Sequence, residues 1–288
     1  MLLETGFVRE LEALRRRLQV RARSGGGGER MAKRRGSSAE FLEHRPYAPG
    51  DDLRRIDWLA YARTGEPVFK LFRAEEDVVM RIVVDGSASL AGGTPPKIEV
   101  AKKLAAAIGY LGLAASERTQ VAYASDGLDK LCEPARGRGA LSKLLRELDA
   151  IEPNGETDLA TAIDQVLLRS SRPGMLVVVS DFMDPGPFDA AITKAASMGH
   201  DVSMVQVLAR EEVDPQFDGD FALEDVETGE IVEVTMDAAA IEAYLARLNK
   251  LLLAMRALAK KTRATYVRHV ADEPVINAVR RFVGRVVD

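Results

Sequence analysis

Short runs of β-branched apolar residues alternate with longer stretches of helical periodicity from residue 78 onward. Runs that stay apolar throughout are typical of strands buried on both faces of a sheet. Their alternation with helices requires crossover connections between parallel strands. The sequence therefore predicts an α/β fold, a doubly wound, mostly parallel sheet with flanking helices. The predicted strands are 78–84, 175–179, 201–208 and 264–268, and the predicted helices are 97–116, 141–148, 157–170, 187–198, 238–262 and 274–286.

Two hairpins interrupt this alternation. Residues 119–124 and 128–133 flank Asp126-Gly127, a dipeptide that favours a tight turn between antiparallel strands. Glu227-Thr-Gly-Glu230 predicts the turn of a second hairpin. This second hairpin is predicted to be an acidic insertion around residues 211–236, before the long helix.

The first 76 residues follow a different pattern. Apolar residues at helical spacing predict an Arg-rich helix within a basic arm at 1–36, where Ser24-Gly-Gly-Gly-Gly28 should end the helix. Residues 37–76 predict a small β-rich element whose clearest strand is 68–72. The α/β domain then covers residues 77–288.

Composition excludes several classes of protein. The formal net charge of -4 favours neither nucleic acid nor an anionic membrane as a partner of the whole chain. The single cysteine, Cys132, excludes an intramolecular disulfide and a zinc site built from several cysteines. The N-terminal residues mix Glu and Arg, and the longest apolar stretch, 104–115, is shorter than the roughly 20 residues that span a bilayer. We expect a cytoplasmic protein without membrane insertion.

Charge is nevertheless uneven along the chain. Residues 1–36 hold ten Arg or Lys against four Glu, whereas residues 211–242 hold twelve Asp or Glu and no basic residue. We interpret both tracts as solvated faces. The alternative is that either tract docks a partner of opposite charge.

Oxygen-bearing side chains follow the predicted strands. Asp85-Gly-Ser-Ala-Ser89 comes directly after one buried strand, and Ser180-Asp181 comes directly after another. Thr157 stands at the start of a predicted helix, which it is placed to cap. Ligands of open α/β sheets bind beyond the carboxyl ends of the strands. Each of these residues by itself is common in turns and caps. Their joint order along the chain predicts a binding site.

The chemistry of this set points to a hard cation. Hydroxyl and carboxylate oxygens suit Mg²⁺ or Mn²⁺. Two serines, one threonine and two aspartates do not easily complete a closed octahedral shell, so we expect one position open to water or to another molecule's carboxylate. Because only two formal negative charges face the dication, an incoming Asp or Glu is favoured.

This set resembles the metal-ion-dependent adhesion site of von Willebrand factor A domains, over roughly residues 77–210. The resemblance implies that Ser87 and Ser89 bind the metal directly. It implies that Asp85 and Asp181 bind it directly or through water, and that Thr157 completes the site.

A second resemblance covers essentially the whole chain. The segment HRPYAPGDDLRRIDW from His44 to Trp58, followed by Ala62-Arg-Thr-Gly65, is similar to the signature of the bacterial family called domain of unknown function 58. In that family the signature precedes a von Willebrand factor A-like core. Genes of the family commonly lie beside genes for MoxR-type AAA+ ATPases. The resemblance therefore implies a metal-dependent adaptor that works with such an ATPase on client proteins and recognises an Asp or Glu of its partner.

Aromatic and charged residues are dense within this signature. We expect Tyr47, Ile56 and Trp58 to pack against the core and the charged residues to form an ion-pair network that clamps the loop. The alternative is a partner-binding surface, because loops often carry function. The candidate partner-binding residues are Tyr47, Asp51, Asp52, Arg54, Arg55, Asp57 and Trp58.

Three other functions fit the sequence less well. A Mg²⁺-dependent phosphatase of the haloacid dehalogenase type needs a second Asp two residues after Asp85, where this chain has Ser87. A serine hydrolase needs a G-x-S-x-G elbow and a suitably placed histidine, which the chain lacks. A nucleic-acid-binding role for the basic arm is disfavoured, because residues 1–76 have few aromatic residues for base stacking and the whole chain is acidic. The chain also has no Walker A motif. We expect a protein that is not an enzyme.

Overall fold

The computed structural model describes residues 3–24, 40–48, 56–73, 79–115, 117–125, 127–156, 158–170, 172–183, 187–216, 219–224 and 231–285. The chain divides into two compact units. The larger unit comprises residues 1–15 and 78–288, and the smaller comprises residues 16–77.

The larger unit is built on one mixed sheet with the strand order β11-β8-β7-β3-β4-β5, and β6 also pairs with β4. Neighbours from β11 to β4 are parallel, whereas β5 and β6 run antiparallel to β4. The strand order reverses between β3 and β7, which is where an open α/β sheet binds ligands. The strands are β3 (Val79–Asp85), β4 (Arg118–Ser125), β5 (Gly127–Leu131), β6 (Ala135–Arg136), β7 (Met175–Ser180), β8 (Asp201–Leu208) and β11 (Thr265–Val270).

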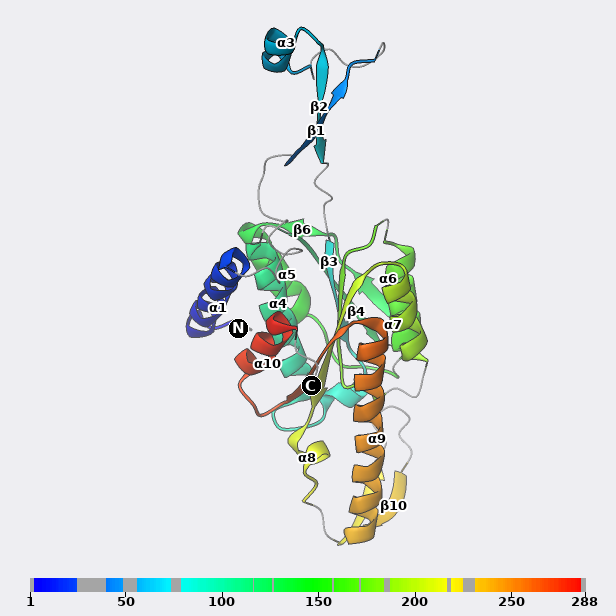
Figure 1. Cartoon of the computed structure of the whole chain (residues 1–288). Helices are drawn as coiled ribbons and strands as arrows, with labels where there is room; N and C mark the ends of the chain where they lie inside the picture. Colours follow the sequence, from blue (N-terminus) through cyan, green and yellow to red (C-terminus); the bar gives the residue numbers. More distant parts are fainter. Residues whose placement is uncertain are drawn as a thin grey trace. The chain divides into compact units, whose positions relative to one another are not determined.

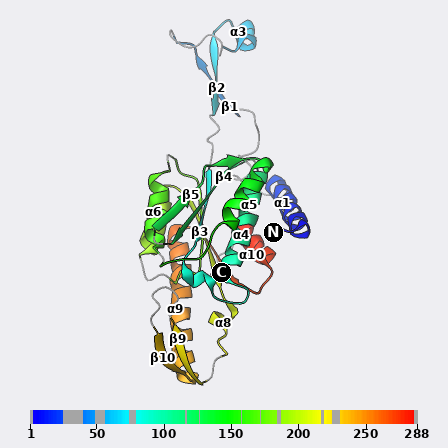
Figure 2. The same ribbon diagram turned by 180° about the vertical axis from the view of Figure 1, so that it is seen from behind.

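Helices cover this sheet on both faces (Figures 1 and 2). One face packs against α4, α5 and α10, and the other against α6, α7 and α9. Successive residues of one strand enter opposite cores, so that Ile82 and Val84 join the first and Val83 joins the second. The helices are α4 (Lys97–Ala114), α5 (Leu141–Asp149), α6 (Leu159–Leu168), α7 (Phe188–Ser197), α9 (Ala238–Thr262) and α10 (Val275–Gly284), with 3-10 turns at Ala88–Ala91 and Arg138–Ala140.

The predicted fold class is confirmed. The strands read as continuous apolar runs because both of their faces are covered. The start of α6 differs from the prediction, because Asp158 is its N-cap and accepts a hydrogen bond from the amide of Thr161 over 2.8 Å. Predicting Thr157 as the cap was therefore wrong, and Thr157 itself lies outside the described residues.

Both predicted hairpins are present. Strands β4 and β5 pair across the Asp126-Gly127 position. Strands β9 (Gly219–Glu224) and β10 (Ile231–Met236) form a separate antiparallel pair before α9. A short helix that the sequence did not predict, α8 (Arg210–Val213), follows β8.

The N-terminal helix α1 (Thr5–Ser24) begins within the larger unit. Leu3 and Leu11 are buried in the core beside α4 and α10. The division between the two units consequently falls inside α1, at residue 15, rather than near residue 36, where the sequence places the end of the arm. Among the described residues, no helix combines the length and apolarity that a membrane span requires.

The smaller unit pairs β1 (Glu40–Pro46) with β2 (Val68–Arg73) and carries helix α3 (Trp58–Thr64) between them. The sequence predicted the strands and missed the helix. Asp57 caps α3 by accepting the amides of Leu59 and Ala60, and Gly65 ends it at a φ of 74°.

Candidate functional site

Asp85 lies at the carboxyl end of β3, buried under the loop that follows it. Its Oδ1 accepts a hydrogen bond from the backbone amide of Ser87 over 2.9 Å. Its Oδ2 accepts one from the hydroxyl of Ser180, at the end of β7, over 2.6 Å. The carboxylate therefore joins the two strands that flank the reversal of strand order.

Three oxygen atoms from the two predicted loops lie in contact. Ser87 Oγ is 3.0 Å from Ser89 Oγ, and the hydroxyl of Ser89 donates to Asp181 Oδ2 over 3.3 Å. The structure thus brings together four of the five predicted metal ligands, Asp85, Ser87, Ser89 and Asp181. It does so because β3 and β7 are adjacent parallel strands that end at the same edge of the sheet.

Asp181 is held by a buried polar chain. Its Oδ1 accepts the amide of Met183 over 3.0 Å, and its backbone carbonyl accepts the side-chain amide of Gln206 over 2.7 Å. The hydroxyl of Tyr266 in turn donates to Gln206 over 2.5 Å. Phe182, which is fully buried, takes a left-handed φ of 55°. For a bulky residue this conformation is costly, and the surrounding packing holds it in place.

The loop that leads to Thr157 lies beside the serine loop. The amide of Ala88 donates to the carbonyl of Gly155 over 3.0 Å, and the amide of Asn154 donates to the carbonyl of Gly86 over 2.8 Å. Thr157 lies outside the described residues, so its place as the fifth ligand stays a prediction. The residues two and three positions before it are in contact with the site.

Two charged residues that the sequence reasoning missed complete the site. Lys97, the first residue of α4, places its Nζ 2.7 Å from Asp181 Oδ2 and 2.5 Å from Glu212 Oε1. Glu212 belongs to α8. A lysine eight residues after Ser89 carries no recognisable pattern, and Glu212 lies within the tract that we interpreted as a solvated acidic face. Only the packing of α4 and α8 at one edge of the sheet brings them together.

The electrostatics of the site reflect burial. Desolvation, reinforced by the neighbouring charge of Asp181, raises the pKa of Asp85 to about 6, against the opposing hydrogen bonds from Ser180 and Ser87. Burial by itself lowers the pKa of Lys97, but the carboxylates of Asp181 and Glu212 outweigh it and hold that pKa above the ordinary lysine value. The sequence predicted two carboxylates at this site. The structure places three carboxylates there, those of Asp85, Asp181 and Glu212, together with the ammonium of Lys97.

The oxygen set fits a small divalent cation. Cis ligands of an octahedral Mg²⁺, at about 2.1 Å from the metal, are separated by about 3.0 Å. The distances from Ser89 Oγ to Ser87 Oγ and to Asp181 Oδ2, 3.0 and 3.3 Å, match this separation between neighbouring ligands. Within the described ranges, no group of three His, Cys, Asp or Glu side chains could hold a metal ion. A metal at this edge would therefore depend on the serine hydroxyls.

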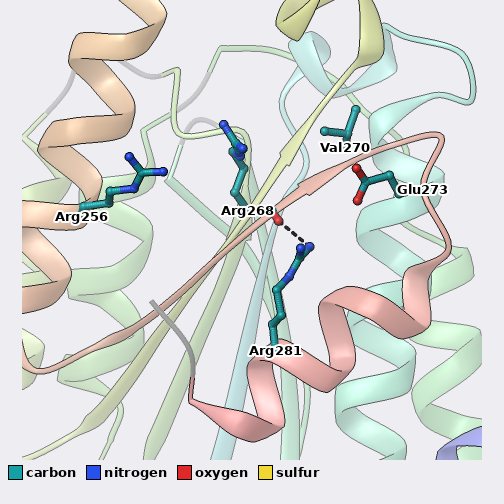
Figure 3. A pocket seen from close by; sticks show the side chains of 5 residues that line it. All are labelled: Arg256, Arg268, Val270, Glu273 and Arg281. Atoms are coloured by element: carbon teal, nitrogen blue, oxygen red, sulfur yellow. Dashed lines mark hydrogen bonds between the residues drawn. The ribbon is translucent and has the colours of Figure 1, made fainter. Parts of the chain in front are cut away.

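A pocket of about 190 Å³ lies at the edge strand β11 (Figure 3). Three arginines line it, and one of them, Arg281, donates to the backbone carbonyl of Arg268 over 2.8 Å. Arginine side chains offer no lone pair to a metal and repel it. The pocket is therefore no alternative cation site. Its lining residues are Arg256, Arg268, Val270, Glu273 and Arg281.

The signature segment in the smaller unit is described only in part. Tyr47 donates its amide to the carbonyl of Pro67 over 2.9 Å, and Asp57 is the N-cap of α3. Ile56, which belongs to the smaller unit, is buried, and its predicted packing against the core stays a prediction. The prediction that Trp58 packs inward was wrong, because it is 60% exposed. Trp58 meets Tyr61 edge to face at 6.1 Å, so the two rings share the surface of α3. The predicted Asp51, Asp52, Arg54 and Arg55 lie outside the described residues.

A doubly wound sheet whose reversal point carries a D-x-S-x-S loop and a second acidic loop defines a von Willebrand factor A-like domain. The chain belongs to the family described as protein of unknown function DUF58, whose model matches residues 43–250.

Several known proteins and solved structures are similar to this chain. The uncharacterized protein Rv1480 of Mycobacterium tuberculosis is 35% identical over 218 residues, which cover 74% of this chain and 68% of the relative. BatB from Bacteroides thetaiotaomicron is 18% identical, with a TM-score of 0.47 over 72% of this chain and 98% of that one. The vWF domain of the type V pili tip protein Mfa5 from Porphyromonas gingivalis is 11% identical, with a TM-score of 0.32 over 73% of this chain and 86% of that one.

Proposed function

We propose that this chain is a non-catalytic protein-interaction domain that holds Mg²⁺ or Mn²⁺ through Asp85, Ser87, Ser89, Thr157 and Asp181. The observation that carries the proposal is the contact series Ser87 Oγ, Ser89 Oγ and Asp181 Oδ2, whose spacing matches one edge of an octahedral shell. The metal would supply a Lewis-acidic position for an acidic side chain of the partner. The protein's own residues fix the serine hydroxyls and the second carboxylate around that position.

The partner is an AAA+ ATPase of the MoxR type, with client proteins presented to it. Support for this comes from the family resemblance, since the genes of the two families are commonly neighbours. The chain contributes no nucleotide-binding loop of its own, because it has no Walker A motif. The exposed rings of α3 offer a second surface to the same partner.

The placement of His200 and His269 supports a non-catalytic role, because neither is positioned as a general base for the serines of the site. His200 accepts the amide of Gly174 through Nδ1, near the amino end of β7, whereas the serines lie beyond the carboxyl end of β3. His269 is fully buried, and its pKa is lowered to about 4 by burial and by the charge of Arg281, with Asp272 opposing. Within the described residues, neither ring forms a hydrogen bond with a serine of the site.

The metal is tested by thermal unfolding titrated with Mg²⁺ and Mn²⁺. At ten times its dissociation constant, a ligand stabilises the fold by about 1.4 kcal/mol, which raises Tm by a few degrees. We expect this rise in the wild type and its loss in Ser87→Ala/Ser89→Ala. Ser203→Ala is the matched control, since Ser203 is a buried serine near the amino end of β8. An equal rise in all three proteins contradicts the assignment.

The partner is tested by calorimetric titration of the purified MoxR-type ATPase into this protein. We expect binding with Mg²⁺ and ATP, and its loss both in EDTA and in Ser87→Ala/Ser89→Ala at saturating Mg²⁺. Because the ATPase itself uses Mg²⁺, the serine variant separates the metal of this domain from that of the motor. Undiminished binding of the serine variant would overturn a metal-bridged contact.

A further inference from the structure

A buried lysine, Lys97, forms ion pairs with two carboxylates at the candidate site. The side chain of Lys97 is 3% exposed, and its Nζ is shared between Asp181 Oδ2 at 2.7 Å and Glu212 Oε1 at 2.5 Å. A buried ammonium is retained only when carboxylates compensate it. Two carboxylates do so here.

Glu212 is itself fixed in place. Its second oxygen, Oε2, accepts the backbone amide of Ala209 over 2.7 Å, at the start of α8. The turn before α4 packs closely on the same residue, because a Cβ atom on Gly93 would lie 2.8 Å from Ala209 Cβ. Gly93 also has a φ of 90°, so both the close approach of Ala209 and the backbone conformation favour a glycine there. The backbone thus places the first residue of α4 next to α8.

The ammonium and a metal compete for one oxygen. Asp181 Oδ2 accepts both the hydroxyl of Ser89 and the ammonium of Lys97. A divalent cation bound between Ser89 and Asp181 would replace both contacts. Two positive centres on one buried carboxylate oxygen repel each other strongly, because the Coulomb energy at about 4 Å is several times larger in a protein than in water.

On the basis of the proposed metal function, we infer that Lys97 is the resident cation of this site and competes with the divalent metal for Asp181. Metal binding then requires Lys97 to leave Asp181, while Glu212 can keep its partner. When metal is scarce, the ammonium of Lys97 thereby offsets part of the negative charge of the site and occupies Asp181. Lys97 sets the affinity for the metal, although it is not a ligand.

The experiment measures Mn²⁺ affinity, with free Mn²⁺ read by electron paramagnetic resonance, in the wild type and in Lys97→Met. We expect the variant to bind Mn²⁺ at least about tenfold more tightly, because a buried positive charge is removed beside a dication. We also expect its Tm to fall below that of the wild type without metal and to recover with Mn²⁺, as the metal replaces the lost ammonium.

Lys102→Met is the matched control. Lys102 is another buried lysine of α4, and its Nζ contacts Glu99 and the carbonyl of Asp149, at 3.4 Å each, instead of the site. Its removal should leave Mn²⁺ affinity unchanged. The double variant Lys97→Met/Glu212→Gln is measured in parallel. It removes both partners of the Lys97–Glu212 ion pair, so it leaves no unpaired Glu212 and serves if the single variant fails to fold.

The outcomes separate this inference from the proposed function. Tighter binding in the Lys97 variants supports the inference, even if the wild type binds no Mn²⁺ detectably. Equal or weaker binding in those variants, with clear binding by the wild type, overturns the inference and leaves the metal site standing. Absence of binding in every protein overturns both.

Discussion

The hydroxyl of Ser180 donates to Asp85 Oδ2 over 2.6 Å and accepts the amide of Phe182 over 2.8 Å. One buried hydroxyl therefore satisfies two groups on adjacent loops. Ser180→Ala leaves a buried amide and a buried carboxylate without this partner, which costs about 1–3 kcal/mol for each group. We expect an unfolding free energy lower by about 2 kcal/mol or more, measured by urea denaturation. Ser203→Ala should cost clearly less, and an equal loss in both variants would count against the bridging role.

Asp85 is expected to reduce stability near neutral pH. Its pKa is raised from 3.8 to about 6, so the folded protein binds this proton more tightly than the unfolded chain does. Stability contributed by the neutral carboxyl is present below pH 4 and is lost as pH rises to 6 and above. Asp85→Asn removes the ionisation, so in EDTA it should stabilise the protein by about 2–3 kcal/mol at pH 8 and much less at pH 4.5. A gain that is the same at both pH values would contradict this explanation.

His269 is expected to limit stability in acid. Burial, followed by the charge of Arg281, lowers its pKa to about 4, and neither ring nitrogen has a hydrogen-bond partner among the described residues. The unfolded chain therefore binds the proton more readily, and stability falls as pH drops below about 6.5. At pH 5 the loss is on the order of 2 kcal/mol. His269→Phe should lose correspondingly less stability between pH 7 and pH 5, as denaturant melts at the two pH values will show.

Trp58 is expected to contribute to partner binding rather than to stability. Its ring is 60% exposed on α3, so Trp58→Ala should change the unfolding free energy by less than about 1 kcal/mol. Exposed aromatic residues are frequent binding hot spots, and affinity for the ATPase should fall tenfold or more. Leu168→Ser is the control, because Leu168 is an 81% exposed apolar residue on α6. Unchanged affinity of the Trp58 variant would remove α3 from the interface.

Much of the fold could be predicted from periodicity. The buried strands are apolar on both faces, and α9 runs over residues 238–262 as its spacing predicts. The α3 helix escaped prediction because its seven residues are too short for a periodic signal, and only the cap at Asp57 and the end at Gly65 mark it. The inward packing of Trp58 was a wrong prediction, because an aromatic residue in a short segment does not reveal which side faces solvent.

The sequence by itself determined the parallel sheet and the order of the loops with Asp85, Ser87, Ser89 and Asp181, since chain order and apolar runs are local properties. Tertiary structure alone decided that Lys97 and Glu212 enter the site, because 115 residues separate them and only the packing of α4 against α8 joins them. It likewise decided the charge of the site and the raised pKa of Asp85. Burial and Coulomb interactions depend on distances in space, which residue spacing along a chain does not encode.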